Sequence, residues 1–422
     1  MANRLLAALT ALGLALAIGG AMQTSWADEN KSADKPKAGS IMDPTVGRHL
    51  KAAVAELQEQ HYAQAEAELG ELNMDHLSPY ERSRAEQLFA VAEQLLGHYD
   101  AAREHLKQAI ASGGLNDQEV STARFQLARL YMAENKWKEG AAALEEWFKT
   151  AQNPNSAAYH LLAVAYYQMG NHTAALVPAQ KAVDLGGAKP QASWLQLLLA
   201  IQLELKQYKP AIGTVKRLIE QEPNNKNYWL QLAGLESTIG DSQGAAVAIE
   251  LPYRAGWFTG EDNALRLTQF LIQAGIPYRA GEVLNQAMQK GEVKSDLQNI
   301  NLLSNCWLAS KEYEKALKPM RRAADLSPTG ENYLRLAQVY VQREDWPNAS
   351  DTLRLAIDRG NLKNTGDALL LMGIASNNQK QPALARTWFE KAKGYSTSRA
   401  HAEGWLIHID EEQRSKTQTV SH

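Results

Sequence analysis

Internal repetition is the feature that most limits what this chain of 422 residues can fold into. From about Val46 onward the sequence repeats with a period of about 34 residues, and each copy holds two stretches in which apolar residues recur at helical spacing. A unit of two short helices cannot bury its apolar side alone, so such units stack and each contacts only its neighbours. The repetition therefore predicts an all-α array of helical hairpins rather than one large core.

The clearest copy covers residues 156–189. Small residues where two antiparallel helices cross let the backbones approach, and large residues fill the space beside them. The sequence predicts alanines at that crossing in five copies: Ala175, Ala245, Ala280, Ala316 and Ala349. Between the two helices of a copy lie turn segments such as Gly170-Asn171, Gly240-Asp241 and Lys311-Glu312, and glycine suits the left-handed conformation that ends a helix.

The residue pattern of these copies resembles the tetratricopeptide repeat. In the clearest copy it is carried by Tyr159, Leu162, Ala163, Tyr166, Gly170, Ala175, Ala179 and Ala182, and roughly ten copies follow it with changes. The resemblance implies a right-handed superhelical solenoid with a concave face lined mostly by first helices, a surface that binds extended peptides or helices. We therefore expect a protein-binding scaffold.

Proline and composition suggest how the array is divided. Pro252 falls inside a predicted second helix, where it removes a hydrogen-bond donor, so we expect a kink or an early helix end followed by an irregular connector. The alternative is a boundary between two sub-arrays. On this basis the sequence predicts an N-terminal array over 46–258, a C-terminal array over 259–398, a capping helix over 399–416 and a polar tail over 417–422.

The N-terminus has the pattern of a secretory signal. Arg4 precedes an apolar run from Leu5 to about Met22, and Ser25-Trp26-Ala27 forms a site for cleavage after Ala27. An uncleaved membrane anchor is the alternative, which the glycines of the run disfavour. Residues 28–45 are charged and poor in large apolar groups, which predicts a flexible tether. We therefore expect a signal peptide over 1–27 and a mature protein in the periplasm.

The sequence offers little for catalysis, metal binding or nucleic-acid binding. A formal net charge of −3 provides no basic field for a polyanion. The single cysteine, Cys306, lies in an apolar helical pattern without a nearby base and is expected to be a buried packing residue. His401 and His408 lack a third ligand for a metal. We expect no enzyme activity, no cofactor and no nucleic-acid partner.

A binding groove would take its contacts from first-helix positions that the core does not use. In the stronger copies these positions hold aromatic, histidine and amide side chains, and amides can bond the backbone of a ligand without demanding a particular side chain. Plain solvent exposure is the alternative for each of them. The predicted contact residues are His160, Tyr167, Gln269, Asn301, Asn305, Gln338 and Gln342.

The C-terminal half narrows the role further. The segments 276–284, 323–327, 331–338, 345–349 and 356–362 resemble the periplasmic tetratricopeptide-repeat proteins encoded with TonB-ExbB-ExbD energy-transduction systems of Gram-negative bacteria. The resemblance covers about Trp229 to Trp405. It implies an accessory of TonB-dependent outer-membrane transport, commonly of iron chelates, with TonB, ExbB or ExbD components as partners and a peripheral association with their membrane complex.

Two other functions stay open at this stage. One is a scaffold for envelope or polysaccharide-export machinery. The other is a peptidoglycan- or glycan-binding module that uses exposed aromatic side chains.

Overall fold

A computed structural model describes residues 42–420, with side chains described as far as Arg414. Within that range every regular element is a helix and no strand occurs, which confirms the all-α fold. None of these helices combines the length and the apolar character needed to cross a membrane. The predicted signal peptide over 1–27 and most of the predicted tether over 28–45 lie outside the described residues.

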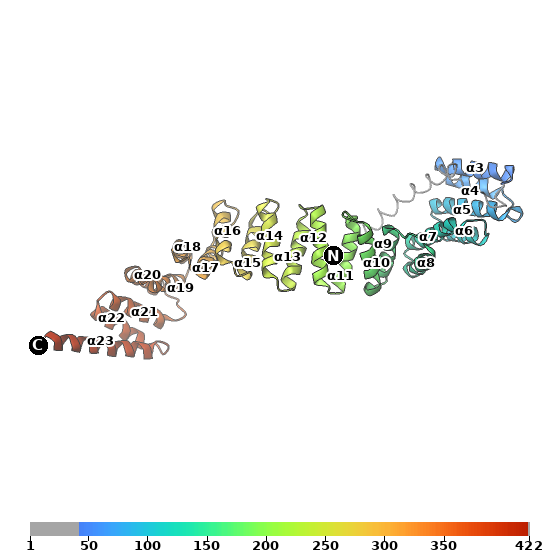
Figure 1. Cartoon of the computed structure of the whole chain (residues 1–422). Coiled ribbons are helices and arrows are strands. Elements are labelled where there is room, and N and C mark those ends of the chain that lie inside the picture. Colours follow the sequence, from blue (N-terminus) through green and yellow to red (C-terminus); the bar gives the residue numbers. More distant parts are fainter. Residues whose placement is uncertain (1–41, 421–422) are drawn as a thin grey trace. The chain divides into compact units, whose positions relative to one another are not determined.

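The chain divides into two compact units, Met1–Pro223 and Asn224–His422, and each is described by itself. In the first unit five helical hairpins follow one another, and the second helix of each packs on the first helix of the next (Figure 1). Their helices are α3 (Pro44–Gln58) and α4 (Tyr62–Gly70), α5 (Pro79–Leu96) and α6 (Tyr99–Ala111), α7 (Asp117–Ala133) and α8 (Trp137–Thr150), α9 (Ser156–Gln168) and α10 (His172–Leu185), and α11 (Ala192–Glu204) and α12 (Tyr208–Gln221).

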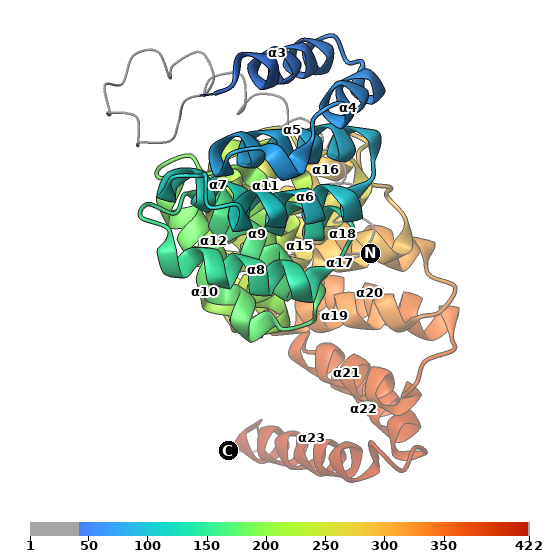
Figure 2. The ribbon, with the colours of Figure 1, turned by 90° about the vertical axis from the view of Figure 1, so that its right-hand side faces the viewer.

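The second unit repeats this arrangement and ends in a single helix. Its hairpins are α13 (Lys226–Thr238) and α14 (Ser242–Arg254), α15 (Glu261–Gln273) and α16 (Pro277–Gln289), α17 (Leu297–Ala309) and α18 (Tyr313–Leu326), α19 (Glu331–Gln342) and α20 (Trp346–Arg359), and α21 (Thr365–Asn378) and α22 (Pro382–Lys393). The last helix, α23 (Arg399–Val420), packs on α22 through Ala402, Leu406 and Ile409, as Figure 2 shows for this end of the unit. It therefore caps the stack.

Alanine sets how closely the helices approach. All five alanines predicted at the hairpin crossing are fully buried, with 0% of their surface exposed. Large side chains fill the space beside them: Leu303, Trp307 and Leu336 belong to one cluster of the second unit that includes Ala316. The prediction of the crossing residues is therefore confirmed, and the core of each unit is a series of small clusters rather than one centre.

Acidic residues in the first turn of a helix tie neighbouring hairpins together. Glu331, at the start of α19, accepts a hydrogen bond from the backbone N–H of Lys363, which belongs to the loop before the next hairpin. Glu261, at the start of α15, accepts from the Lys294 N–H at 3.3 Å. These carboxylates also lie where the helix dipole favours negative charge.

Both ends of the described chain are more helical than the sequence predicted. α3 begins at Pro44, inside the predicted tether, because the Asp43 carboxylate accepts the N–H of Thr45 at 2.7 Å and Pro44 already has a helical φ. The predicted tail over 417–422 was placed too early, since α23 continues past residue 416 to Val420.

Pro252 does not end its helix early, and the expectation of an early end was wrong. α14 contains 13 residues, as α16 does, and proline also lies inside α10 at Pro178 and inside α18 at Pro319. The compact units divide after Pro223 rather than at the predicted position between 258 and 259. Phe258 is 1% exposed, so the chain near this predicted boundary is packed core rather than a linker.

Candidate protein-binding surface

All ten hairpins of the described chain turn in the same way. One residue in each turn has a positive φ between 55° and 86°: Gln60, Gly97, Asn135, Gly170, Lys206, Gly240, Gly275, Lys311, Glu344 and Lys380. The N–H of the next residue donates to the carbonyl five residues before it, at 2.8–3.0 Å in every hairpin. This is the Schellman arrangement, which satisfies the last carbonyls of the first helix. It therefore fixes the register of each first helix against its turn.

The register defines equivalent positions along the first helices. We call the residues ten, six and three positions before the positive-φ residue the first-helix face, because this spacing puts them on one side of a helix. In the first unit they are Leu50, Val54, Leu57, Gln87, Val91, Gln94, Phe125, Arg129, Met132, His160, Val164, Tyr167, Gln196, Ala200 and Leu203. In the second unit they are Leu230, Gly234, Ser237, Leu265, Gln269, Ile272, Asn301, Asn305, Leu308, Leu334, Gln338, Val341, Leu370, Ile374 and Asn377.

Six of the seven predicted contact residues lie on this face. His160 and Asn301 occupy the position ten before the turn residue, Tyr167 the position three before it, and Gln269, Asn305 and Gln338 the position six before it. The seventh, Gln342, is two before Glu344 and lies beside the face. The structure thus brings the predicted residues together by register within each unit, and their role in binding stays a prediction.

In the second unit the face presents neutral amides. Gln269, Asn305 and Gln338 are exposed and Asn301 is partly buried. The Asn305 side-chain oxygen accepts a hydrogen bond from the Arg335 guanidinium at 2.7 Å, which shows that α17 and α19 lie side by side. Amides both donate and accept, so a row of them matches the alternating N–H and C=O groups of an extended peptide.

In the first unit the face mixes aromatic and apolar side chains with amides and one arginine. The ring centroids of His160 and Trp194 are 6.0 Å apart, which places α9 beside α11, and the Tyr167 ring lies 5.2 Å from that of His172. Burial lowers the pKa of His160 to about 4, so its imidazole is neutral at physiological pH. Its buried Nδ1 has no hydrogen-bond partner among the described residues.

Arg129 is a functional candidate that the sequence prediction missed. It lies on α7 six residues before Asn135, the position that Gln269, Asn305 and Gln338 hold in other hairpins. Its side chain is partly buried, and burial lowers the pKa of its guanidinium below the ordinary value. Counting back six residues from the turn at Asn135 gives its position, but the lack of a partner for its charge is visible only in the structure.

The comparison with known families agrees with this geometry. The tetratricopeptide-repeat family matches residues 89–154, 125–193 and 334–400, which lie in both units. Both units therefore contain tetratricopeptide repeats. Repeats of this family are modules for protein–protein interaction, so a role as a binding scaffold is supported.

Solved structures of other tetratricopeptide-repeat proteins are similar at low identity. One is YrrB, described as having an unusual peptide-binding site, at 14% identity over 45% of this chain and 88% of that chain, with a TM-score of 0.34. A tetratricopeptide-repeat protein of Parabacteroides merdae has 16% identity over 58% and 94%, with a TM-score of 0.35. MamA of Desulfovibrio magneticus has 18% identity over 44% and 99%, with a TM-score of 0.37. No curated protein matches the sequence.

The weaker chemical candidates of the chain are packing or surface residues. Cys306 is 1% exposed, and burial raises the pKa of its thiol to about 11, which suits a buried apolar residue rather than a nucleophile. His401 and His408 are both exposed on α23. No group of three or more His, Cys, Asp or Glu side chains within residues 42–414 is placed to hold a metal ion.

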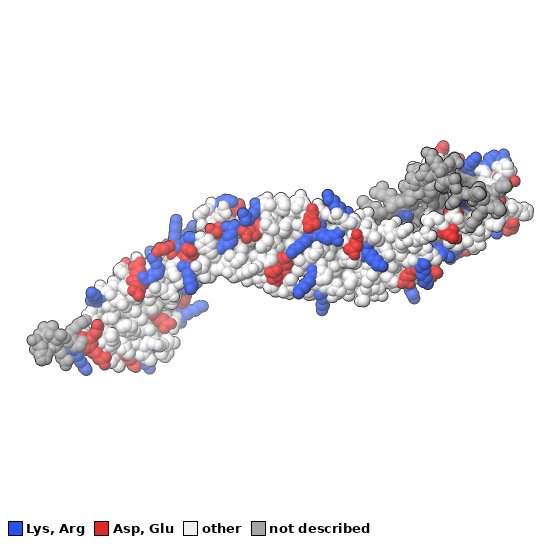
Figure 3. Space-filling model, in the orientation of Figure 1, with Lys and Arg blue, Asp and Glu red and all other residues white. Residues whose placement is uncertain are grey.

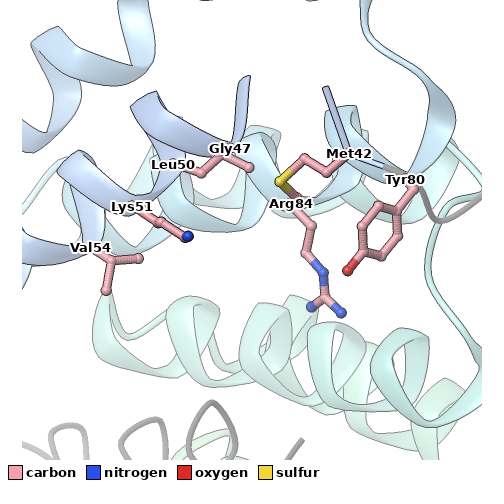
Figure 4. A pocket seen from close by; sticks show the side chains of 7 residues that line it. All are labelled: Met42, Gly47, Leu50, Lys51, Val54, Tyr80 and Arg84. Carbon is pink, nitrogen blue, oxygen red and sulfur yellow. The ribbon is translucent and has the colours of Figure 1, made fainter. Parts of the chain in front are cut away.

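A cavity of about 230 Å³ lies between α3 and the start of α5 (Figure 4). Met42, Leu50 and Val54 give it an apolar lining, and the ring of Tyr80 closes one side. The guanidinium of Arg84 lies 5.2 Å from the Tyr80 ring centroid and pairs with Glu119. Because that charge is already compensated, the cavity presents mainly apolar surface.

Proposed function

We propose that this tetratricopeptide-repeat protein is a non-enzymatic periplasmic scaffold that binds an extended segment of a partner protein along its first-helix face. The observation that carries the proposal is the shared register of the face, which places the exposed amides Gln269, Asn305 and Gln338 at the same position of three first helices, beside aliphatic residues. Main-chain groups of an extended segment can bond the amides, while its side chains contact the aliphatic residues between them.

We further propose that the partner belongs to a TonB-ExbB-ExbD system and that the protein is an accessory of outer-membrane transport. Two features of the sequence support this: the resemblance of about Trp229 to Trp405 to periplasmic proteins encoded with such systems, and the secretory pattern over 1–27. Because such a partner is anchored in the inner membrane, the scaffold would associate with the membrane peripherally, through the partner.

The charge distribution supports a protein partner over a nucleic acid. The face of the molecule in Figure 3 carries Lys and Arg interspersed with Asp and Glu, with wide uncharged areas between them. The net charge of the chain is −3. A polyanion binds by neutralising many phosphates with a continuous set of cations, and that face offers no such set.

Photo-crosslinking in cells of the source organism tests the proposal. A photo-crosslinking amino acid replaces Gln338 on the first-helix face or, as the matched control, Gln286, which is exposed on the second helix α16. We expect crosslinks to TonB, ExbB or ExbD components from position 338 and few from position 286. Crosslinks only to export or wall-synthesis proteins would contradict the TonB link and keep the scaffold. Equal crosslinking from both positions would contradict binding at the first-helix face.

A further inference from the structure

Within residues 42–414, Arg129 is the one charged residue among the first-helix-face positions of the two units. The other positions hold Leu, Ile, Val, Met, Ala, Gly, Phe, Tyr, Ser, Asn and Gln, together with the neutral His160. In three hairpins of the second unit the position of Arg129 holds an amide instead: Gln269, Asn305 and Gln338. A cation here is therefore not a requirement of the hairpin.

The guanidinium of Arg129 has no counter-ion within the described chain. No carboxylate forms an ion pair with it and no hydrogen bond compensates it, although its side chain is partly buried. Arg103 in the preceding hairpin shows what a structural arginine of this fold looks like: it is 4% exposed, pairs with Asp100 and Glu134, and lies 4.8 Å from the Tyr131 ring centroid. A cation withdrawn from water without a partner costs free energy, which a bound anion would recover.

The surroundings of Arg129 suit a ligand that is otherwise uncharged. The neighbouring first helix α9 lies in a run from Thr150 to Gln180 without a single Asp, Glu, Lys or Arg. On the other side, α5 presents Gln87, Val91 and Gln94. A ligand with several charges would leave most of them desolvated without a partner on such a face. Because α5 and α9 carry equivalent positions on both sides of α7, the face leaves room for a ligand to extend in both directions from Arg129.

We propose that Arg129 binds the side-chain carboxylate of a single Asp or Glu within an otherwise uncharged, extended peptide segment of the partner protein. Guanidinium and carboxylate groups pair through two parallel, charge-assisted hydrogen bonds, which select both the charge and the position of the acid. The inference rests on the proposed function, peptide binding along the first-helix face, and adds the chemistry of the segment that the first unit recognises.

Selection from a displayed library of random twelve-residue peptides tests this inference with the whole chain. The library is selected on the wild type, on Arg129→Gln, on Arg129→Glu and on the control Lys138→Gln. Gln is the residue that two equivalent positions of this chain already hold, so R129Q is compatible with the hairpin. Lys138 is exposed on α8 of the same hairpin, so K138Q removes the same charge from the other helix.

We expect the wild type and K138Q to enrich peptides with one Asp or Glu flanked by uncharged residues. R129Q should lose that acid preference and bind the best wild-type peptide at least about tenfold more weakly, because a hydrogen bond between charged groups is lost. R129E should enrich Lys or Arg at the same place. A merely structural arginine would not produce this exchange of preference.

Two other results are distinguishable. If the wild type enriches peptides without an acid preference, or if R129Q keeps that preference, the first-helix face binds peptides and the role of Arg129 is refuted. If the wild type enriches no peptide, peptide binding itself fails and the inference falls with it. The free energy of unfolding of R129Q is the second measurement. Because the wild-type cation is uncompensated, we expect R129Q to be at least as stable as the wild type. A marked loss of stability would overturn the assignment.

Discussion

Acid should weaken the first unit through one histidine. His160 is packed against Trp194 on the first-helix face, and burial lowers the pKa of its imidazole from 6.5 to about 4. Above pH 6.5 the imidazole is neutral in both the folded and the unfolded chain. As the pH falls from 6.5 towards 4, the unfolded chain takes up a proton that the folded chain does not. The free energy of unfolding must therefore fall over this window.

The magnitude follows from the distance between the two pKa values. Each pKa unit corresponds to about 1.4 kcal/mol, so His160 should cost about 2 kcal/mol of stability at pH 5 and about 3 kcal/mol at pH 4. Because each hairpin contacts only its neighbours, the loss should be concentrated in α9 to α11 rather than spread over both units.

Hydrogen exchange read by mass spectrometry can measure this locally, on peptides that cover α9 to α11, between pH 7.5 and pH 4.5. The wild type is compared with His160→Gln, whose residue 160 does not titrate. The contributions of all other titrating groups to the loss of protection then cancel in the difference. His401→Gln, an exposed histidine of the second unit, is the control and should behave like the wild type in these peptides. If the wild type and H160Q lose protection in parallel as the pH falls, the reasoning about a buried neutral imidazole is refuted.

Four substitutions test the packing and the backbone geometry, each measured by urea unfolding. Leu336→Ala removes a side chain with 0% exposure and should cost about 2–5 kcal/mol, and a cost below about 1 kcal/mol would contradict the packing described for its cluster. Gly330→Ala should destabilise by about 1–3 kcal/mol, because the new Cβ would lie 2.1 Å from the carbonyl oxygen of Ala356. Gly234→Ala should instead stabilise by about 1 kcal/mol, because its new Cβ meets nothing within 4 Å and Gly234 lies inside α13. Lys311→Gly should stabilise by about 1 kcal/mol, since Lys311 holds a φ of 59° that costs a non-glycine residue free energy, and a loss of stability would contradict the turn.

The fold could be predicted from the sequence because repetition multiplies a weak pattern. One copy of Leu, Ala and Tyr at helical spacing is ambiguous, but roughly ten copies fix the hairpin, its crossing alanines and its turn together. The helix ends were less predictable. Asp43 and Pro44 start α3 inside a charged segment, and only the geometry of the cap reveals that the chain is helical there.

The candidate surface could be predicted only in part. Asn301 and Gln338 were recognisable because they are polar residues at non-core positions of strong copies. Arg129 was not, because its copy is weak and because the decisive property is the absence of a partner, which depends on side chains brought together from several helices. Pro252 was misread for a similar reason: the sequence shows the lost donor but not that the helix continues around it.

The shared turn separates the residues that build the hairpin from those that face a ligand. Its hydrogen bond joins two backbone groups, so it persists whatever side chains occupy the first-helix face. The codons of the exposed positions, such as those of Gln269, Asn305 and Gln338, can therefore change in evolution without altering the register of the helices that carry them. Shuffling whole hairpins, or diversifying these codons in a combinatorial gene library, should give scaffolds that keep their architecture while their specificity is rewritten.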